Sequence, residues 1–448
     1  MSFPRYPKYK DSGVEWLGEV PADWRVLPLA RVATSRCDGP FGSSLKSEHY
    51  TETGVRVIRL QNIRREGFDG SDTAFIDSKY YQRELAGHDV VRGDLLIAGL
   101  GDDNNVVGRA CVAPVGIEPA LVKADCFRFR LDPTQALTAF VAVALCSSAE
   151  ADAGRLATGS TRSRIPLSEM SSRKVPVPPL AEQLAIAAFL ERETAKIDAL
   201  VAEQQRLIEL LNEKRQAVIS HAVTKGLNRD APMKDSGVAW LGKVPAHWGT
   251  SQSRRMFRVR SEQALDSDRQ LTASQKHGVI FQSDFVELEG RRVVEVIMWT
   301  ENLLHVEPDD FIISMRSFQG GIEWCRLRGS TSYHYVMLTP VKDVHPPFFA
   351  HVFKRAVYIQ ALRATTNLIR DGQELRYSHF AQVPLPVAPM DEQARIAAFL
   401  DVELARFDAL TAEAQRAIDL LRERRTALIS AAVTGQIDVR DAAATAAA

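Results

Sequence analysis

Two copies of one short motif constrain this chain more than any other feature of its sequence. Residues 10–24 read KDSGVEWLGEVPADW and residues 234–248 read KDSGVAWLGKVPAHW, so twelve of fifteen positions are identical at a separation of 224 residues. Such a long recurrence indicates an internal duplication. The fold is therefore expected to contain two equivalent places that hold the same motif.

A second, longer repeat follows in each half of the chain. Residues 182–226 and 392–436 share 27 identical residues in 45 positions, at an offset of 210. Residues 25–175 and 249–388, which we call the first and second middle regions, show no comparable identity to each other. This order predicts two equal docking surfaces and two different reading regions.

The longer repeat has the pattern of an amphipathic helix. Its apolar residues recur at steps of three and four, which is typical of a helix that packs along another helix. Prolines followed by acidic residues, at 178–182 and 389–392, mark the two starts, and Gly226 and Gly435 mark the two ends. The residues predicted to pack between the helices are Ile197, Leu200, Leu207, Leu211, Phe407, Leu410, Leu421 and Leu428.

The length of this helix favours a coiled coil. A single helix over residues 182–224 would span about 65 Å at ~1.5 Å per residue, although a break near residues 193–195 is compatible with the sequence. A whole domain connects the two helices, so an antiparallel pair is feasible. Helices buried in a core are the alternative, but outer faces rich in Glu, Lys and Arg favour a projecting pair.

Both middle regions have a mixed α/β pattern. Short strands are predicted at residues 55–60, 94–98, 127–131, 293–298, 310–315 and 335–338, and helices near 137–147 and 348–363. Glycine-rich loops separate these segments. The expected fold class is mixed α/β, with two α/β domains joined by two long antiparallel helices in a pseudo-twofold duplicated arrangement.

Composition restricts the possible functions. Of 448 residues, 56 are Lys or Arg and 56 are Asp or Glu, so bulk charge does not hold this chain on nucleic acid. Basic residues exceed acidic ones by 20 to 18 in the first middle region and 17 to 15 in the second. Any basic surface must therefore be local or come from a partner.

The five cysteines and the N-terminal residues indicate a reducing compartment. Cys37, Cys111, Cys126, Cys146 and Cys325 have neither disulfide nor zinc spacing. Residues 1–10 lack the apolar stretch of a signal peptide, and no run of about 18 apolar residues predicts a membrane span. We expect a cytoplasmic protein.

Two motifs suggest chemistry that their residues do not support. Residues 237–244 read GVAWLGKV, but Val244 stands where a P-loop needs Ser or Thr, and Glu19 replaces the lysine in the first copy. Residues 345–349 read HPPFF, similar to an amino-methyltransferase motif, but His345 lacks the carbonyl group that holds the target amine. Pro346 and Pro347 are predicted to begin a helix instead. No catalytic residue and no metal ligand is predicted.

The doubled motifs resemble the specificity subunit of type I restriction–modification systems. The resemblance runs from Lys10 to about Val439 and rests on KDSGVxWLGxVPxxW paired with EQxxIAAFL…IDALxxExQRxIxLLxExRxAxIS. Residues 38–50, 57–63, 93–101, 316–323 and 369–378 are similar to that family's target recognition domains. The resemblance implies a non-enzymatic subunit that binds double-stranded DNA at a bipartite site.

The family resemblance also implies the partners. Each target recognition domain would read one half of the DNA site, and the helices would set the spacer. Two methylation subunits would dock on the repeated regions, and restriction translocase–nuclease subunits would join them. S-adenosylmethionine, ATP and magnesium would belong to those partners, with no cofactor in this chain.

The repeats predict the domain boundaries. They divide the chain into an N-terminal repeat motif (1–24), a first target recognition domain (25–175), a central repeated region with a long helix (176–228), a second repeat motif (229–248), a second target recognition domain (249–388), a C-terminal repeated region with a long helix (389–440) and a disordered tail (441–448).

Polar and basic loop residues are the candidates for DNA contact, because base edges are read by donors and acceptors and phosphates by cations and amides. In the first middle region these are Arg36, Ser43, Ser44, Lys46, Gln61, Asn62, Arg64, Asn104, Asn105, Arg109, Thr158, Ser160, Thr161, Arg162, Ser163 and Arg164. In the second they are Lys276, His277, Arg316, Ser317, Gln319, Thr331, Ser332, Tyr333, Asn367, Arg370, Gln373, Arg376 and Tyr377.

The tryptophans of the short motif have two interpretations. Trp16, Trp24, Trp240 and Trp248 could stack on bases, but their apolar setting in both copies favours packing anchors. Two other functions also compete with DNA recognition. A coiled-coil scaffold leaves the two divergent domains unexplained, and a self-sufficient methyltransferase or nuclease predicts a cofactor loop or metal carboxylates.

Overall fold

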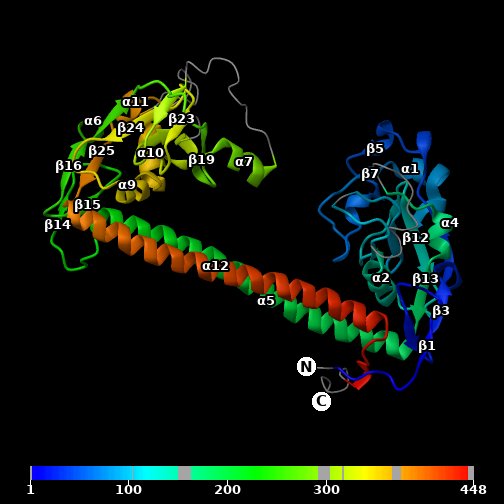
Figure 1. The fold of residues 1–448 in the computed structure, drawn as a ribbon. Coiled ribbons are helices and arrows are strands. Elements are labelled where there is room, and N and C mark those ends of the chain that lie inside the picture. The colour runs from blue at the N-terminus through cyan, green and yellow to red at the C-terminus, as the bar shows by residue number, and fades with distance from the viewer. Residues whose placement is uncertain are drawn as a thin grey trace. The chain divides into compact units, whose positions relative to one another are not determined.

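The structure, a computed structural model, describes residues 3–102, 104–149, 163–290, 303–314, 317–365 and 375–441. It divides into two compact units (Figure 1). Unit 1 consists of residues 1–204 and 416–448, and unit 2 of residues 205–415. Each unit thus combines one middle region, one short repeat motif and parts of both long helices.

The two long helices begin and end where the sequence predicts. Helix α5 runs from Leu180 to Lys225 and α12 from Met390 to Val433. Each follows a proline, and the chain leaves each helix through a glycine with positive φ, +70° at Gly226 and +73° at Gly435. Residues 193–195 are helical, so α5 has no break there.

The helices are antiparallel within each unit. In unit 1 the end of α12, with Leu428 and Ile429, packs on the core that contains Ile186 near the start of α5. In unit 2 the end of α5 shares a core with Ile396 near the start of α12. Ion pairs cross the helices, Asp198 to Arg425 in unit 1 and Arg215 to Asp408 in unit 2. The predicted mixed α/β class with an antiparallel helix pair is confirmed.

The residues between the helices differ in part from the prediction. Ile197, Leu211 and Phe407 are buried as expected, and Leu421 and Leu428 are half-buried. The prediction is wrong for Leu200, Leu207 and Leu410, whose exposed fractions are 45%, 43% and 40%. Each of these three leucines is next to an inward position, and one residue rotates a side chain about 100° around a helix. Ala414, which belongs to the same apolar pattern, is buried, and so is Ile418.

Both middle regions contain the same four-stranded antiparallel core sheet. Its order is β10 (Ala110–Val112), β9 (Leu95–Ala98), β12 (Cys126–Leu131), β4 (Ala33–Cys37) in the first. In the second it is β22 (Glu323–Trp324), β21 (Phe311–Ile313), β24 (Val336–Pro340), β17 (Phe257–Arg260). The four positions correspond one to one, so regions without recognisable sequence identity share a scaffold.

Matching elements surround the two core sheets. Strands β3 (Arg25–Pro28) and β13 (Lys174–Val177) join the ends of the first region, as β16 (Gly249–Gln252) and β25 (Pro384–Val387) do in the second. Helix α2 (Thr138–Ser147) covers the first core, and α9 (Pro346–Phe353) and α10 (Ala356–Ala364) cover the second. Helices α4 (Leu167–Ser172) and α11 (Tyr377–Phe380) precede β13 and β25.

The outer parts of the two regions differ. The first has a five-stranded sheet of β5 (Tyr50–Thr51), β7 (Phe75–Ile76), β6 (Val55–Ile58), β11 (Ala120–Val122) and β8 (Asp89–Val90). The second has two pairs, β18 (Leu271–Ser274) with β19 (Gly278–Phe281) and β20 (Leu304–Val306) with β23 (Gly329–Thr331), and helix α7 (Gln282–Glu289).

Most predicted elements of the middle regions are confirmed, with one correction. The segment 348–363 forms two helices, because the backbone of Arg355 is extended. The Lys354 ammonium group is held by Gly320 and Glu323, and Arg355 bonds to Ser220. The predicted strand at 293–298 lies outside the described residues.

The short motif forms a hairpin in each unit. Strands β1 (Tyr9–Asp11) and β2 (Glu19–Pro21) pair in unit 1, and β14 (Met233–Asp235) and β15 (Lys243–Pro245) pair in unit 2. Trp24 and Trp248 follow these hairpins and are fully buried, which confirms that they are packing anchors.

An adjacent Glu–Gln pair at the start of each long helix holds three parts of the unit together. The carboxylate of Glu182 accepts a hydrogen bond from the Trp24 indole (3.0 Å), and Glu392 accepts one from Trp248 (3.0 Å). The next residue, Gln183 or Gln393, bonds to the middle region. Its amide oxygen accepts from the backbone N–H that precedes α2 or α9, at Leu137 (2.7 Å) or His345 (2.9 Å).

The amide nitrogens of the two glutamines complete the arrangement. Gln183 donates to the carbonyls of Gln135 (3.0 Å) and Pro178 (2.9 Å), and Gln393 donates to Asp343 and Ala388 (both 2.9 Å). Each glutamine therefore connects the start of its long helix with the strand before that helix and with the end of the core sheet at which β12 or β24 finishes.

The described part of the chain contains no helix long and apolar enough to cross a membrane.

We predict that Gln183→Ala and Gln393→Ala each lower the free energy of unfolding by about 1–3 kcal/mol, because each leaves a half-buried backbone N–H and two carbonyls without the glutamine partner. Urea unfolding followed by circular dichroism measures the change. Gln216→Ala, at an exposed position of α5, is the matched control. Equal unfolding midpoints for all three variants would contradict the role assigned to the pair.

Candidate nucleic-acid interface

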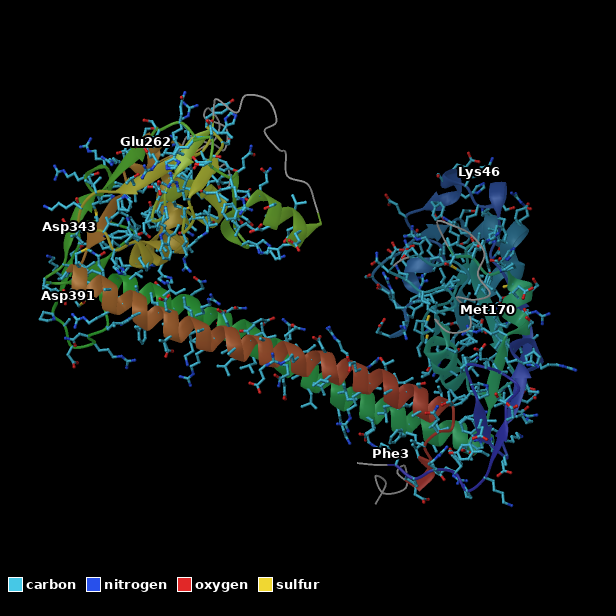
Figure 2. All side chains as sticks on the ribbon, viewed as in Figure 1. Phe3, Lys46, Met170, Glu262, Asp343 and Asp391 are labelled. Carbon is cyan, nitrogen blue, oxygen red and sulfur yellow. The ribbon has the colours of Figure 1, made fainter. Side chains whose placement is uncertain are left out.

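Each core sheet has two functionally different ends. At the helix end, β12 and β24 finish close to Gln183 and Gln393 respectively. At the loop end, β4 and β9, or β17 and β21, finish and β12 or β24 begins. Within each unit, Figure 2 shows Lys46 and Glu262 away from the helix starts, and Asp343 nearer to Asp391. The loop end is therefore the part of each region free to meet a large ligand.

Four of the predicted loops of the first middle region meet at its loop end. The backbone of Gly101 donates to Ser163 (2.8 Å), and Arg64 donates to the side-chain oxygen of Asn105 (2.9 Å). Arg164 donates to Asp125 (2.7 Å), whose backbone N–H donates to Asp38 (2.9 Å). Residues up to 126 positions apart thus form one surface.

The predicted contact residues on this surface differ in accessibility. Arg64 and Asn105 are half-buried. The structure does not describe Thr158, Ser160, Thr161 and Arg162 or the side chain of Ser43. The exposed candidates are Arg36, Ser44, Lys46, Gln61, Asn104, Ser163 and Arg164.

Asn62 and Arg109 are structural residues, so the prediction that they contact DNA is wrong. The Asn62 amide is buried and bonds to the backbone of Arg59, Asp69 and Asp72. The Arg109 guanidinium is also buried and donates to four backbone carbonyls, at 2.7–3.1 Å, of residues 60, 63, 100 and 106. In the sequence alone, an arginine that contacts a ligand from a loop cannot be told from an arginine that is buried and bonds to the carbonyls of several loops.

At the loop end of the second middle region, several of the predicted DNA-contact residues are not accessible. Ser317 and Thr331 are buried, and Ser317 accepts from the backbone of Ser314 (2.8 Å), so neither is available. Tyr377 lies at the helix end, where its hydroxyl donates to the carbonyl of Phe257 (3.3 Å). The prediction is wrong for these three residues.

The remaining candidates of the second region are more accessible. Gln319, Tyr333 and Arg376 are exposed, and Ser332 is half-buried. Lys276 and His277 both contact one carboxylate oxygen of Glu289, at 2.7 and 2.8 Å. Arg316, Asn367, Arg370 and Gln373 lie outside the described residues.

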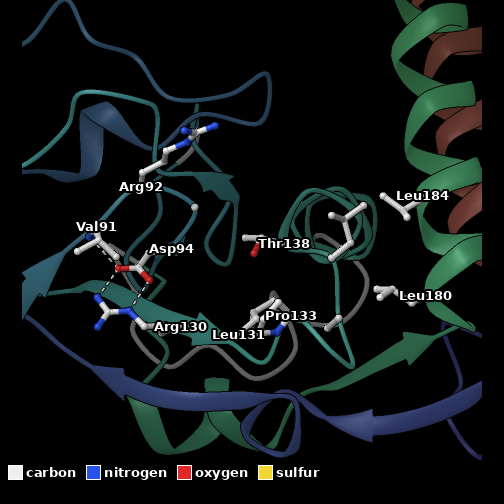
Figure 3. Close-up of a pocket in the computed structure, with 12 residues that line it drawn as sticks. Val91, Arg92, Asp94, Arg130, Leu131, Pro133, Thr138, Leu180 and Leu184 are labelled. Carbon is white, nitrogen blue, oxygen red and sulfur yellow. Dashed lines mark hydrogen bonds and ion pairs between the residues drawn. The ribbon is translucent and has the colours of Figure 1, made fainter.

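The helix end of the first region contains a hollow of about 520 Å³ (Figure 3). Figure 3 shows Asp94 paired with Arg130 on one side and Leu180 and Leu184 of α5 on the other. Both leucines are exposed. This hollow lies between a middle region and a long helix, and its wall combines the Asp94–Arg130 ion pair with apolar side chains.

Sequence reasoning missed two kinds of residue that the structure singles out, a pair of buried glutamines and an exposed aromatic ring. Gln183 and Gln393 were recognisable only as identical residues in the two repeats. Phe41, in the sequence GPFG, is exposed at the first loop end and was passed over because it is apolar. The residues on both sides of Phe41, Gly39–Pro40 and Gly42, are typical of turns, and they were the available signal that this ring lies in an exposed loop.

Comparison with known proteins agrees with this architecture. Residues 95–210 match the family model for the type I restriction modification DNA specificity domain. A putative type I restriction enzyme MjaX specificity subunit from Methanocaldococcus jannaschii is 19% identical over 95% of this chain and 96% of its own length. The EcoBI specificity subunit from Escherichia coli is 21% identical over 88% and 83%.

Solved structures show the same fold. The HsdS subunit from Thermoanaerobacter tengcongensis has 14% sequence identity and a TM-score of 0.54, covering 93% of this chain and 98% of that one. A chain from a structure of type I R-M complex assembly has 15% identity and a TM-score of 0.59, covering 92% and 98%.

The fold and its loop ends thus define a duplicated, two-headed recognition scaffold. Over residues 95–210 the chain matches the specificity-domain model, and along most of its length it is similar to specificity subunits of type I restriction–modification systems.

We predict that Arg109→Gln lowers the free energy of unfolding by about 3 kcal/mol or more, since buried carbonyls lose a charged donor. Thermal unfolding of the variant measures the loss. Arg36→Gln, at an exposed position of the same region, should leave the unfolding temperature unchanged. An Arg109 variant of normal stability with impaired DNA binding would restore the original assignment.

A second prediction concerns Asp38. Burial, with a contribution from the charge of Asp125, raises the pKa of Asp38 to about 6 despite hydrogen bonds from two backbone amides. An unfolded aspartate titrates near pH ~3.9, so the stabilisation from protonating this group is complete below that pH and is lost as pH rises through about 6.

Asp38→Asn keeps the acceptor oxygen and removes the charge. Relative to the variant, the wild-type chain should therefore lose stability between about pH 4 and pH 6, as urea unfolding at a series of pH values would show. Asp23→Asn, at an exposed position, should run parallel to the wild type. A constant difference between the Asp38 variant and the wild type would show that Asp38 titrates normally.

Proposed function

We propose that the chain selects the DNA site for a type I restriction–modification complex, with each middle region reading one half of a bipartite sequence. The observation that carries this proposal is the pair of core sheets with the same strand order and different loop ends. A common scaffold gives the two regions the same relation to their helices, and different loops give them different base preferences.

The exposed residues fit recognition of double-stranded DNA. Arg36, Lys46 and Arg164 supply cations for phosphates or guanine, and Gln61 and Asn104 supply paired donors and acceptors for adenine. Arg36 lies near the end of strand β4, and the other four residues come from segments separated in sequence that meet at the same end of the sheet. The antiparallel helices would then set the number of base pairs between the two half-sites.

The duplicated helices fit two copies of one partner. Exposed apolar residues recur at equivalent positions of the repeat, as Leu180 and Met390, Leu200 and Leu410, and Leu210 and Leu420. Leucines that face away from the helix seam leave apolar area for another protein to cover. We assign these surfaces to two methylation subunits, which translocase–nuclease subunits would then join.

The proposal assigns catalysis to the partners. S-adenosylmethionine would bind to the methylation subunits, and ATP and magnesium to the translocase–nuclease subunits. The rival functions remain testable, because a pure scaffold would select no DNA sequence and a self-sufficient methyltransferase would bind S-adenosylmethionine as an isolated chain.

The experiment is a genome-wide map of N6-methyladenine in a host without adenine methylation of its own, expressing this chain with its methylation subunit. We expect one bipartite motif. The double variant Gln61→Ala/Asn104→Ala should change only one half of it, and Gln319→Ala/Tyr333→Ala only the other. A motif that neither pair alters, or none at all, would remove the proposed function.

The electrostatic part of the proposal has its own test. Lys46→Ala should weaken binding of the purified complex similarly for all DNA sequences and reduce the slope of log affinity against log salt by about 1, because one phosphate contact is lost. Fluorescence anisotropy at several salt concentrations measures the slope. An unchanged slope would exclude Lys46 from the phosphate contacts.

A further inference from the structure

Phe41 is an exposed aromatic ring on an otherwise well-anchored loop. Its exposed fraction is 47%, whereas Pro40 before it and Leu45 after it are buried. Gly42 has a φ of +62°, which turns the chain directly after the ring. The loop therefore presents this side chain while its neighbours hold it in place.

The anchoring of this loop leaves little freedom. A Cβ atom on Gly39 would lie within 2.5 Å of the backbone of Lys123 and Ala124, so only glycine permits this close approach. The Asp38 carboxylate accepts from the Gly39 N–H (2.7 Å), and the Tyr80 hydroxyl donates to the Ser44 carbonyl (2.7 Å). Exposing an apolar ring to water costs free energy. The contacts that anchor this loop leave about half of the Phe41 side chain exposed, so packing within the chain does not offset that cost.

The charges around Phe41 indicate the kind of ligand. The Arg164 guanidinium lies 5.5 Å from the ring centroid, and its side chain is 47% exposed. Lys46 is 55% exposed on the same loop. Arg164 is paired with Asp125 (2.7 Å) and Lys46 lies 3.9 Å from Glu48, but both basic side chains remain about half exposed. An apolar ring beside such cations is complementary to a surface with apolar groups between anionic phosphates, which is the surface of a DNA groove.

The second middle region has a corresponding ring. Tyr333 has an exposed fraction of 56% and lies in the turn before β24, which is equivalent to the turn before β12 against which Gly39 packs. The ring of His334 is 4.0 Å from it, centroid to centroid. An exposed aromatic residue therefore lies at the loop end of both core sheets, although the two loops have unrelated sequences.

We propose that Phe41 is a specificity-determining residue of the first half-site, where its ring makes apolar contact with the 5-methyl group of a thymine in the major groove. This inference rests on the proposed function. Thymine methyl is the apolar group that a base edge presents in that groove. A wedge between base pairs is less compatible, because Arg164 lies over the ring and about half of the side chain is covered.

The test compares the wild-type complex with its Phe41→Ala variant on DNA of defined sequence. The preferred site is first obtained by selection from randomised duplexes, with the chain bound to its methylation subunits. Each thymine of that site is then replaced by uracil, which removes only the methyl group. One replacement in the first half-site should weaken wild-type binding about fourfold or more, the value of one buried methyl group.

The variant should bind the unmodified site about tenfold more weakly than the wild type, with an unchanged salt slope. It should also be indifferent to the critical uracil replacement. This loss of coupling is the decisive readout, because a general folding defect would weaken binding to both duplexes alike.

Two matched variants act as controls. Val115→Ala removes an exposed apolar side chain, 72% accessible, from another loop of the same region and should behave like the wild type. Tyr333→Ala should retain the sensitivity to uracil in the first half-site. Unfolding temperatures of all variants show that each is folded.

The outcomes separate this inference from the proposed function. If the wild-type complex selects no sequence, the proposed function fails. If it selects a bipartite site but every uracil replacement affects the wild type and Phe41→Ala equally, Phe41 does not read thymine and only this inference is overturned. Equal weakening by Phe41→Ala at every sequence, with increased 2-aminopurine fluorescence in the wild-type complex alone, would instead indicate a wedge.

Discussion

The hydrogen bonds of two adjacent residues, Glu182–Gln183 in unit 1 and Glu392–Gln393 in unit 2, join each middle region to its helices. The glutamate binds the buried tryptophan of the repeat motif, and the glutamine binds the backbone beside the core sheet. An acidic residue at a helix start is normally explained by the helix dipole. Here burial adds a stronger constraint, because the indole and backbone donors would otherwise be unsatisfied. Each long helix therefore begins in a fixed relation to its middle region.

Both core sheets contain a buried aspartate that is paired with an arginine, but the arginine comes from a different strand in each. Asp94 and Asp310 are both buried, and each accepts from the backbone N–H three residues earlier, at Val91 and Glu307. In the first region the arginine that pairs with the aspartate is Arg130 of β12. In the second it is Arg260 of β17, the strand that lies next to β24, the equivalent of β12. A buried carboxylate needs a cation but does not specify the strand that supplies it. Such exchanges explain how one scaffold persists without recognisable sequence identity.

The charge distribution fits a subunit that acts within a complex. The chain has no net charge, and several of its loop cations are engaged by acids, as Arg164 is by Asp125 and Lys276 by Glu289. Cations paired in this way orient a surface more than they attract DNA over a distance. We infer that much of the affinity for phosphates comes from the partners, and that this chain contributes mainly the choice of bases.

The sequence by itself determined the duplicated plan, the limits of the long helices and the mixed α/β class, because these depend on periodicity, prolines and glycines that act locally. It also identified the loops that meet at the loop ends. Only the tertiary structure decided which of their residues are available. Asn62 and Arg109 look like ligand contacts in sequence, but their donors are used by backbone groups up to 49 residues away. Leu200 and Leu410 follow the apolar pattern but lie one helical step outside the seam. Both errors have one physical reason, since burial depends on contacts between distant segments that no local pattern encodes.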